Sequence, residues 1–473
     1  MIIAVDLDGT LVKTDMLFET LLGCISNDFK IIFKVLIVLL FKGRVGLKNY
    51  LCDIENIDYS TLPYNKLVLN KIKIYKQKGY KIFLVTASPT IVGEKINKHL
   101  NVFDEVFGST ENVNLKGKTK RDFLNKKFGK NTYIYIGNSY DDVAVWKDSH
   151  SAILVNTNKY VKYQVKKFNI THEKLESNNN IVLDFLSAIR IKQWIKNILV
   201  FLPLIAAQNT MSDKLITAIF AALAFSLIAS GVYIFNDLLD IKSDRNHMYK
   251  KKRVLASGQI QLEHSFLIAI MLWISALSLS IFINFYFTVI LIAYLILNFL
   301  YSFKLKKIPI LDIYILASFY SLRIFSGSIA YDIDLSVWLM AFSIFVFYSL
   351  ACLKRSGEAL YNKTSGNNTI SIRGYSSKDT SLLFNMSVTS GYASVILLAL
   401  YINTPEVTEN YNFPIALWVI LFVFFYWINY IIFRTYRGDM FDDPVIFAIK
   451  DKISIFCGLL ILAFWSLATI YEY

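Results

Sequence analysis

Charged residues are scarce in this 473-residue chain: Asp, Glu, Lys and Arg make up 18% of it, whereas hydrophobic residues make up 55%. A soluble globular domain has about 25% charged and about 45–50% apolar residues. The composition therefore excludes a disordered or collagen-like chain and argues against a wholly soluble protein. Cysteine is scarce too, with 4 residues that show no metal-type spacing. We expect free, buried thiols and no disulfide framework.

The N-terminus lacks the features of a signal peptide, because the chain opens on the strand-like sequence MIIAVDLDGT. Positive charge, in contrast, is abundant: 50 Lys and Arg against 36 Asp and Glu give a net charge of +14. In so apolar a chain, this excess indicates membrane lipids, phosphate-bearing ligands and cytoplasmic loops, and it argues against nucleic acid as a partner.

Up to about residue 180, short apolar runs alternate with helical patterns. The expected strands are residues 2–8, 81–87, 132–137 and 151–156, and the expected helices lie around residues 63–78, 90–100 and 118–128. This alternation predicts a Rossmann-like α/β domain over residues 1–165, followed by a polar linker over residues 166–182. The apolar run 30–41 is too short to span a membrane. We expect a buried or cap helix there, with a membrane-facing cap surface as the alternative.

Residues 183–473 contain about nine apolar segments long enough to cross a bilayer. They lie near residues 185–205, 214–235, 265–284, 287–303, 310–330, 336–353, 383–403, 413–433 and 453–472. Lys and Arg concentrate in every second connection, beginning with the one between the second and third segments. By the positive-inside rule, these connections and the N-terminal domain are cytoplasmic. We therefore predict an all-α, multi-pass domain in the inner (plasma) membrane.

The motif DLDGT, residues 6–10, directly follows an apolar strand. Such a carboxylate pair suits phosphoryl transfer through an aspartyl-phosphate, in which one Asp attacks phosphorus and the other protonates the leaving oxygen and later activates water. A divalent cation would screen the two anions. Three further motifs follow in order, namely TAS (86–88), LKGKTK (115–120) and GNSYDD (137–142). They supply, in turn, hydroxyl and amide groups for phosphate, a lysine clamp, and oxygen ligands for the metal.

Together these motifs resemble the haloacid dehalogenase (HAD) phosphatase superfamily over residues 1–155. The resemblance implies that Asp6 is the nucleophile and Asp8 the general acid/base, and that a cap occupies about residues 15–75. The implied phosphate-binding residues are Thr86, Ser88 and Lys120. The implied Mg²⁺ ligands are Asp6, the Asp8 carbonyl group, Asn138 and Asp142. The family usually has Asp where Asn138 stands, so we expect weaker metal binding, with Asp142 compensating.

A second acidic motif ends the second apolar segment, where Asn236, Asp240 and Asp244 recur every four residues. This spacing puts the three side chains on one face of a helix. An Asp at the centre of a membrane helix costs about 2.5–3.5 kcal/mol, so such residues usually face a polar cavity. Oxygen ligands in a row suit Mg²⁺, which binds a few carboxylates together with substrate phosphates. A solvated helix end would explain Asp244 alone. It would not explain why Asn236, Asp240 and Asp244 recur every four residues.

The NDxxDxxxD pattern and the membrane topology resemble the UbiA prenyltransferase superfamily over residues 183–473. Its members transfer a group from a diphosphate donor that Mg²⁺ holds. Six further motifs resemble the decaprenyl-phosphate phosphoribosyltransferases: IRIKQWIKN (189–197), KKKRVLASG (250–258), YSFKLKKIPILD (301–312), the Arg323 segment, ACLKRSGEAL (351–360) and DPVIFAIKD (443–451). Val254 and Ile191 stand where prolines are usual. The connection 304–312 holds lysines and only Asp312, whereas aromatic-prenylating relatives have a second Asp-rich loop there.

The resemblance implies that phosphoribosyl pyrophosphate donates its 5-phosphoribosyl group to a polyprenyl phosphate, with Mg²⁺-assisted loss of pyrophosphate. Basic groups suit a multiply phosphorylated donor. The candidates for its diphosphate and 5-phosphate are Lys250, Arg253, Lys306 and Arg323. The candidates for the lipid phosphate are Lys196, Lys354 and Arg355. Tyr233 and Glu358 would orient the substrate or the lysines.

Presence of both domains on one chain suggests that the HAD domain removes the 5-phosphate of the product, which gives polyprenylphosphoryl-ribose. Two other interpretations stay open. One is a UbiA-type transferase that uses an isoprenyl diphosphate and an aromatic or haem acceptor, with an unrelated phosphatase domain. The other is a membrane anchor without enzymatic activity that carries a phosphatase. The usual excess of Lys and Arg in cytoplasmic loops would also explain several of the lysines.

Overall fold

The computed structural model describes residues 1–28, 30–54, 57–110, 113–177, 180–207, 212–364, 374–440 and 443–470. Residues 178 and 179 of the expected linker, and residues 365–373 between two expected membrane segments, lie outside the described residues. The chain forms two compact units: residues 1–189 with 233–270, and residues 190–232 with 271–473.

A six-stranded parallel sheet organises the first unit, with the strand order β3-β2-β1-β4-β5-β6. The strands are β1 (Ile2–Val5), β2 (Lys81–Pro89), β3 (Glu105–Ser109), β4 (Tyr133–Gly137), β5 (Ser151–Val155) and β6 (His172–Leu175). The predicted parallel sheet is confirmed, and β3 and β6 are additional. Strand β6 lies within the expected linker, where its sequence HEKL shows no apolar pattern. It is an edge strand, so it needs no buried faces of its own.

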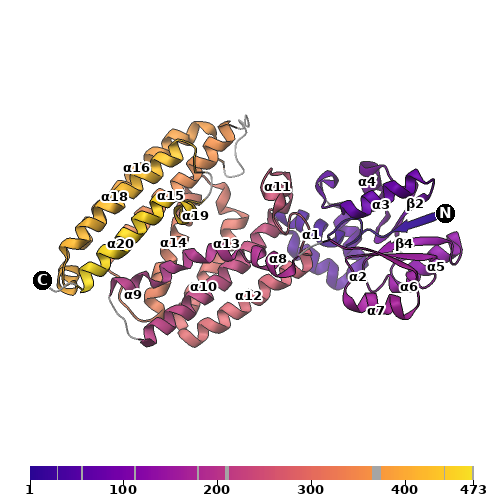
Figure 1. Ribbon diagram of the computed structural model, residues 1–473, viewed down its shortest axis with the longest axis horizontal. Coiled ribbons are helices and arrows are strands. Elements are labelled where there is room, and N and C mark those ends of the chain that lie inside the picture. Colours follow the sequence, from indigo (N-terminus) through magenta and orange to yellow (C-terminus); the bar gives the residue numbers. More distant parts are fainter. Residues whose placement is uncertain are drawn as a thin grey trace. The chain divides into compact units, whose positions relative to one another are not determined.

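Alternate side chains of the inner strands face opposite layers of the core. Ile3 and Val5 belong to one hydrophobic cluster, and Ala4 belongs to the other. Helices α3 (Lys66–Gln77) and α4 (Thr90–Leu100) contribute to the first cluster. Helices α5 (Lys118–Phe128), α6 (Val143–Trp146) and α7 (Lys159–Lys167) contribute to the second. The sheet is therefore covered on both faces, as Figure 1 shows.

The strand order positions the candidate phosphate site. From β1 the chain moves outward through β2 and β3, and then returns to β4 on the other side of β1. At such a reversal the connections leave in opposite directions and open a crevice at the carboxyl ends of the strands. Asp6 follows β1 directly, and Asn138 follows β4. Ser88 lies at the end of β2, which pairs with β1 on the other side, so topology alone brings three of the four phosphatase-like motifs to one edge of the sheet.

The insertion between β1 and α3 contains α1 (Met16–Asn27), α2 (Ile31–Asp53) and the short 3₁₀ helix η1 (Tyr59–Thr61). Gly43, with a φ of 63°, interrupts α2. The apolar run 30–41 forms the part of α2 before this break. Phe33, Leu40 and Phe41 are exposed there. The run is therefore a helix of the expected cap region and not a buried helix.

Eight helices of the described residues are long and apolar enough to cross a membrane, by length and composition. They are α10 (Ser212–Leu239), α12 (Leu262–Ile283), α13 (Phe285–Phe303), α14 (Leu311–Ala330), α15 (Val337–Thr364), α16 (Thr380–Ile402), α18 (Ile415–Tyr436) and α20 (Lys452–Ile470). They correspond to the second through ninth predicted segments and confirm an integral membrane protein. Shorter helices in the connections are α11 (Ile241–Asn246), η3 (Lys250–Lys252), η4 (Leu305–Lys307), η5 (Ser377–Asp379), α17 (Pro405–Asn410) and α19 (Pro444–Lys450).

The predicted first segment, 185–205, is not a continuous spanning helix. It is divided among α8 (Ile181–Ala188), the 3₁₀ helix η2 (Ile191–Phe201) and α9 (Leu202–Ala206). Arg190 adopts a left-handed backbone with a φ of 52°, which ends α8. Lys196 and Asn197 in η2 are buried, and each bonds to polar side chains of its own unit. These contacts, which hydropathy cannot register, explain why the segment is broken.

Candidate functional site

The first cluster of site residues lies at the carboxyl ends of β1 and β4. Lys120, in the first turn of α5, donates to Asp6 Oδ1 over 2.7 Å and to the Tyr135 hydroxyl over 3.0 Å. That hydroxyl donates to Asp142 Oδ1 over 2.7 Å. The Lys120 ammonium therefore joins the predicted nucleophile to a buried acid through one tyrosine. The motifs around residues 6, 120 and 142 form one connected group, as their chemistry requires.

Asp8 and Ser88 form the second half of this cluster. Ser88 Oγ, at the end of β2, donates to Asp8 Oδ2 over 2.9 Å. The backbone N–H of Met16, in the first turn of α1, donates to Asp8 Oδ1 over 2.8 Å. Thr86 lies further inside, where its hydroxyl oxygen accepts from the Ser88 N–H over 2.9 Å. Ser88 therefore contacts the Asp8 carboxylate directly, whereas Thr86 orients the Ser88 backbone.

Asn138 lies against the loop that follows β1. Its Oδ1 accepts from the Thr10 hydroxyl over 3.1 Å. Gly9 has a φ of 72°, and a Cβ built there would lie 2.2 Å from Asn138 Nδ2. Glycine is thus required both by the backbone and by the close approach of the amide. The oxygen atoms of Asp6, the Asp8 backbone and Asn138 are a donor set of the type that Mg²⁺ takes.

Asp142 has a different role from Asn138 in this arrangement. Its Oδ2 accepts from the N–H groups of Asn138 and Ser139 and from the Ser139 hydroxyl, at 3.1, 2.9 and 2.9 Å. With Tyr135 on the other oxygen, the carboxylate holds the loop after β4 in place. Its role as a metal ligand stays a prediction. Among the described residues, no group of three or more His, Cys, Asp or Glu side chains is arranged to hold a metal.

Burial sets the electrostatics of this cluster. It raises the pKa of the Asp6 carboxyl to about 7, although the Lys120 charge acts in the opposite direction. It also raises the pKa of Asp8 to about 6, with a smaller contribution from the charge of Asp15. Burial and the adjacent acids hold the pKa of the Tyr135 hydroxyl well above its usual value. Tyr135 therefore acts as a neutral hydrogen-bond donor and not as a base.

A second cluster lies at the end of α10, in the same unit. Arg253 Nη1 donates to Asp237 Oδ1 over 2.9 Å and to Asp244 Oδ2 over 2.6 Å. The guanidinium thus bridges two carboxylates of this acidic group. Asn236 and Asp240 lie on the same stretch and are half-buried, as is Tyr233 one turn earlier. Helix α10 ends at Leu239 and α11 begins at Ile241, so the predicted register crosses a helix break.

The second unit contains a cluster around Asp443, which caps α19. Asp443 Oδ2 accepts from Lys196 Nζ over 2.8 Å and from Lys354 Nζ over 3.0 Å. The Tyr320 hydroxyl lies 3.1 Å from each oxygen of the carboxylate. Burial alone would raise the pKa of Asp443, but the charges of Lys354 and Lys196 hold it below its ordinary value. Two lysines predicted to meet a phosphate therefore share one carboxylate in this structure.

Arg323 lies inside the second unit among aromatic rings. Its Nε donates to Asn197 Oδ1 over 2.9 Å, and Nη1 donates to the Phe319 carbonyl group. Its guanidinium carbon lies 5.1 Å from the ring centre of Phe225 and 5.6 Å from that of Tyr320. A cation surrounded by ring faces is held by the π electrons as well as by hydrogen bonds. The excess of Lys and Arg in cytoplasmic loops does not account for Arg323, because this cation is buried within a helix.

Arg355 is the centre of a fourth ionic group. Its Nε donates to Asp312 Oδ2 over 2.6 Å, and its Nη1 lies 3.0 Å from both carboxylate oxygens of Glu358. The Tyr375 hydroxyl donates to Asp312 Oδ1 over 2.5 Å. Asp312 is completely buried and Arg355 nearly so. Arg355 is therefore engaged with the protein, and its predicted contact with a lipid phosphate stays a prediction.

Lys250 and Lys306 lie at short 3₁₀ helices in the connections after α10 and α13. Lys250 is exposed and Lys306 half-buried. The residues that the sequence did not single out are Tyr135, Asp237, Asn197, Tyr320 and Asp443. Signals for three of them existed: Asp237 is part of the NDxxD motif, Asn197 ends IRIKQWIKN, and Asp443 opens DPVIFAIKD. Tyr135 and Tyr320 are common residue types at positions without a quoted motif.

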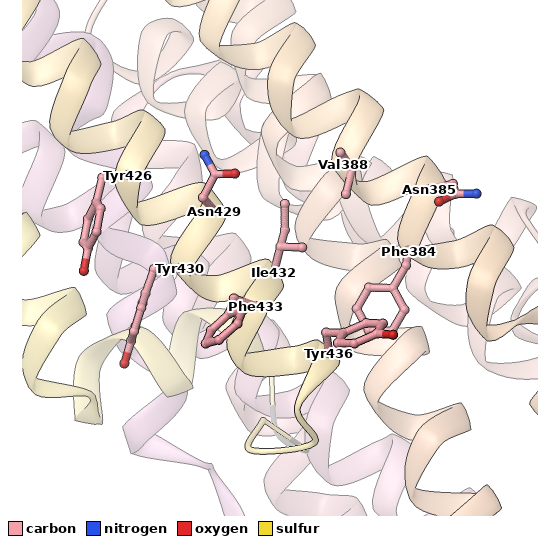
Figure 2. A pocket seen from close by; sticks show the side chains of 9 residues that line it. All are labelled: Phe384, Asn385, Val388, Tyr426, Asn429, Tyr430, Ile432, Phe433 and Tyr436. Atoms are coloured by element: carbon pink, nitrogen blue, oxygen red, sulfur yellow. The ribbon is translucent and has the colours of Figure 1, made fainter.

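Figure 2 shows a pocket between α16 and α18, lined by Phe384, Asn385, Val388, Tyr426, Asn429, Tyr430, Ile432, Phe433 and Tyr436. Aromatic and aliphatic side chains dominate its lining. None of the predicted site residues belongs to it. The ionic clusters, and not this pocket, are therefore the candidate sites for chemistry.

The Asp443 cluster makes a testable prediction about stability. Changing Asp443 to Asn should leave the buried Lys196 ammonium group and the half-buried Lys354 ammonium group without their counter-ion. Breaking a buried ion pair costs about 3–5 kcal/mol. We expect a clearly lower thermal unfolding temperature for the detergent-solubilised protein. Asp439→Asn is the matched control, because the Asp439–Arg434 pair is partly exposed and such pairs contribute about 1 kcal/mol or less. Equal shifts for both variants would contradict the prediction.

The membrane helices and the motif at the end of α10 define a member of a known family. The model of the UbiA prenyltransferase family matches residues 197–439, more than half of the chain. The chain therefore belongs to the UbiA prenyltransferase family. A decaprenyl-phosphate phosphoribosyltransferase from Mycolicibacterium smegmatis is 30% identical over 217 residues, which cover 45% of this chain and 68% of that protein.

Another relative matches both halves of the chain. "Uncharacterized protein y4nM" from Sinorhizobium fredii is 32% identical over 466 residues, which cover 98% of this chain and 90% of that protein. The combination of an N-terminal region like this one with UbiA-type helices is thus found in a second protein.

Among solved structures, a UbiA homolog from Archaeoglobus fulgidus bound to DMAPP and Mg²⁺ is similar with a TM-score of 0.46 and 17% identity, covering 60% of this chain and 99% of that chain.

Proposed function

We propose that this protein is a bifunctional membrane enzyme. Its UbiA-type helices transfer 5-phosphoribosyl from phosphoribosyl pyrophosphate to a polyprenyl phosphate. Its N-terminal domain is a HAD-type phosphatase that removes the 5-phosphate from the product. The basic connections support a cytoplasmic N-terminal domain at the plasma membrane, where the water-soluble donor would be available.

The state of Asp312 is the observation that carries the transferase proposal. A second acidic metal site between α13 and α14 would need free carboxylates. The described connection 304–312 contains a single carboxylate, that of Asp312. This carboxylate is completely buried, and it is bonded to Arg355 and Tyr375. The rest of the connection contributes lysines. This charge balance supports a donor with a phosphate beyond its diphosphate, such as phosphoribosyl pyrophosphate, over an isoprenyl diphosphate.

The acidic group at the end of α10 is suited to the diphosphate of the donor. Asn236, Asp240 and Asp244 would hold Mg²⁺, and the Arg253 bridge shows that Asp237 and Asp244 already share one cation. The bound ion would neutralise the charge of the leaving diphosphate. An oxygen of the lipid phosphate attacks the anomeric carbon, the bond from that carbon to the diphosphate oxygen breaks, and pyrophosphate leaves with the electron pair. The nucleophile is already an anion, so positioning and charge neutralisation are sufficient.

The cations of the chain would hold the remaining phosphates. Arg323 is held rigidly by its amide and aromatic neighbours, which suits a fixed phosphate position. Lys196 and Lys354 share Asp443, so an arriving phosphate would compete with that carboxylate for their protons. The other proposed phosphate-binding residues are Lys250, Arg253, Lys306 and Arg355. Tyr233 and Glu358 would orient the donor and Arg355.

The phosphatase step would use the Asp6–Lys120 and Asp8–Ser88 pairs. Asp6 attacks the phosphorus of the 5-phosphate, and Asp8 donates its proton to the departing ribose oxygen. Asp8 then takes a proton from water, whose oxygen attacks the aspartyl-phosphate and releases inorganic phosphate. Lys120 and Ser88 bind the phosphate oxygens. A second Mg²⁺, held by Asp6, the Asp8 carbonyl group and Asn138, would screen the charge of phosphate from that of Asp6.

A doubly labelled donor tests the two steps together. The full-length protein in vesicles is given polyprenyl phosphate, Mg²⁺ and phosphoribosyl pyrophosphate that carries ¹⁴C in the ribose and ³²P in the 5-phosphate. We expect ¹⁴C to enter the lipid fraction while ³²P appears as inorganic phosphate. A lipid with both labels would overturn the phosphatase step alone. Lack of ¹⁴C-lipid, with product formed from an isoprenyl diphosphate and an aromatic acid, would favour the other UbiA chemistry.

A further inference from the structure

The first part of α2 presents an apolar stripe to the outside of the first unit. Phe33, Leu36, Ile37, Leu40 and Phe41 are 50–83% exposed, and the first four follow the i, i+3, i+4, i+7 spacing of one helix face. The opposite face packs inward, since Val35 is buried against Cys24 and Leu51. Exposed stripes of large apolar residues usually mark an interaction surface.

Lysines border this stripe. Lys30 precedes α2, Lys34 lies one residue after Phe33, and both are exposed. The stripe itself, from Phe33 to Phe41, contains no acidic residue. An apolar face with cations at its border is the pattern of helices that lie in the headgroup region of a membrane with anionic lipids.

The neighbouring helix α1 is attached to the end of a membrane-spanning helix. Arg245 donates to both oxygens of Glu19 in α1, at 2.9 and 2.7 Å, and its Nε donates to the Ala256 carbonyl group over 3.0 Å. Both side chains of this ion pair are buried. Arg245 follows the last residue of the spanning helix α10, Leu239, by only a few residues. Helix α1 is therefore joined to the segment that directly follows a spanning helix.

A second attachment lies before the next spanning helix. Gly258 has a φ of 67°, and a Cβ there would lie 3.0 Å from Lys13 Cβ and 3.1 Å from Pro63. Gly258 precedes α12, which begins at Leu262. The segments on both sides of the α1–α2 insertion thus contact the connection that joins two spanning helices. These contacts tie both ends of the insertion to the connection between α10 and α12.

We propose that α2 is an interfacial helix whose stripe lies in the lipid headgroup region of the bilayer that α10 and α12 span. The Gly43 break separates this lipid-facing part from the part of α2 that packs on the α/β domain. Beyond the break, Lys48 Nζ donates to the Ala87 carbonyl group over 3.0 Å, next to Ser88. The membrane contact would bring the Ser88 loop toward lipid-linked phosphate esters, but it does not depend on the phosphatase reaction.

The test uses the full-length protein in vesicles of phosphatidylethanolamine and phosphatidylglycerol. Cys52, the half-buried thiol, is changed to Ser, and a single environment-sensitive NBD fluorophore is attached at Leu40→Cys. Ile74→Cys on α3 is the control, because Ile74 is an exposed apolar residue on a different helix of the same domain. We expect the fluorophore at residue 40 to emit at shorter wavelength and to be quenched by headgroup-proximal doxyl lipids. The control should instead be quenched by aqueous iodide.

The double variant Lys30→Glu, Lys34→Glu tests the charge complementarity. It should lower the doxyl quenching at residue 40 by at least about twofold in vesicles with phosphatidylglycerol, and much less in phosphatidylcholine vesicles. Iodide quenching at residue 40 equal to that at residue 74 would overturn the proposal. A shift to shorter wavelength that appears only at high protein density, without quenching by the doxyl lipids, would also overturn the proposal. A second copy of the chain would then cover the stripe.

Discussion

Replacing Asp6 by Asn should make the membrane accumulate a lipid that carries both labels of the doubly labelled donor. The amide cannot attack phosphorus as a carboxylate does, so the aspartyl-phosphate would not form. Removal of a covalent nucleophile typically costs at least about a thousandfold in rate. The measurement is the rate of ³²P release as inorganic phosphate, with ¹⁴C incorporation into lipid unchanged. The unchanged first step distinguishes loss of the phosphatase from loss of the whole enzyme.

The matched control for this variant is Asp141→Asn. Asp141 belongs to the same motif as Asn138, but its side chain is 47% exposed and pairs with Lys116 at the surface. It should release phosphate at nearly the wild-type rate. Because Asp6 is the buried partner of Lys120, the thermal unfolding of both variants is recorded alongside. Phosphate release at the wild-type rate by a folded Asp6→Asn protein would show that Asp6 is not the nucleophile.

Replacing Asp240 by Asn should stop the first step instead. The side chain would lose the charge that attracts Mg²⁺, and transition-state charge stabilisation by such an ion amounts to several kcal/mol. We expect ¹⁴C incorporation into lipid to fall by about a hundredfold or more. Asp240 is preferable to Asp244 for this test, because Arg253 bridges Asp237 and Asp244. Substitution of Asp240 leaves both ion pairs in place.

Asp213→Asn is the control for the Asp240 variant, since Asp213 lies in the first turn of the same helix, α10. It should transfer ribose phosphate as the wild type does. The phosphatase domain gives an internal check, because Asp240→Asn should still hydrolyse a soluble phosphate monoester. Full transfer activity in Asp240→Asn would exclude the acidic motif from the reaction. Loss of both activities would indicate a folding defect.

Local patterns in the chain were sufficient for much of the fold. Strands such as 81–87 are short apolar runs, and the spanning helices are long ones, so each could be identified without knowledge of its neighbours. Strand β6 and the broken first segment were missed for the same reason. The polar sequence of β6 is tolerated because it lies at the edge of the sheet. The first segment is as apolar as a spanning helix, yet it is divided around the buried Lys196 and Asn197.

The candidate phosphatase residues were also identifiable, because each belongs to a motif at the end of a strand. In a parallel sheet, strand ends meet at one edge, so Asp6, Ser88 and Asn138 converge by topology. The role of Tyr135 was not identifiable. It lies inside β4 as an ordinary apolar-pattern residue, and only the packing of α5 brings Lys120 to its hydroxyl.

The sequence by itself determined the parallel α/β region, the spanning helices from α10 to α20, their order along the chain and the acidic motifs, because these depend on neighbours within a few residues. Only the tertiary structure decided the partners of the charges. Lys196 and Asp443 are 247 residues apart, and Glu19 and Arg245 are 226 residues apart. Ion pairs form between whichever side chains packing brings within a few ångströms. No periodicity or local motif contains that information.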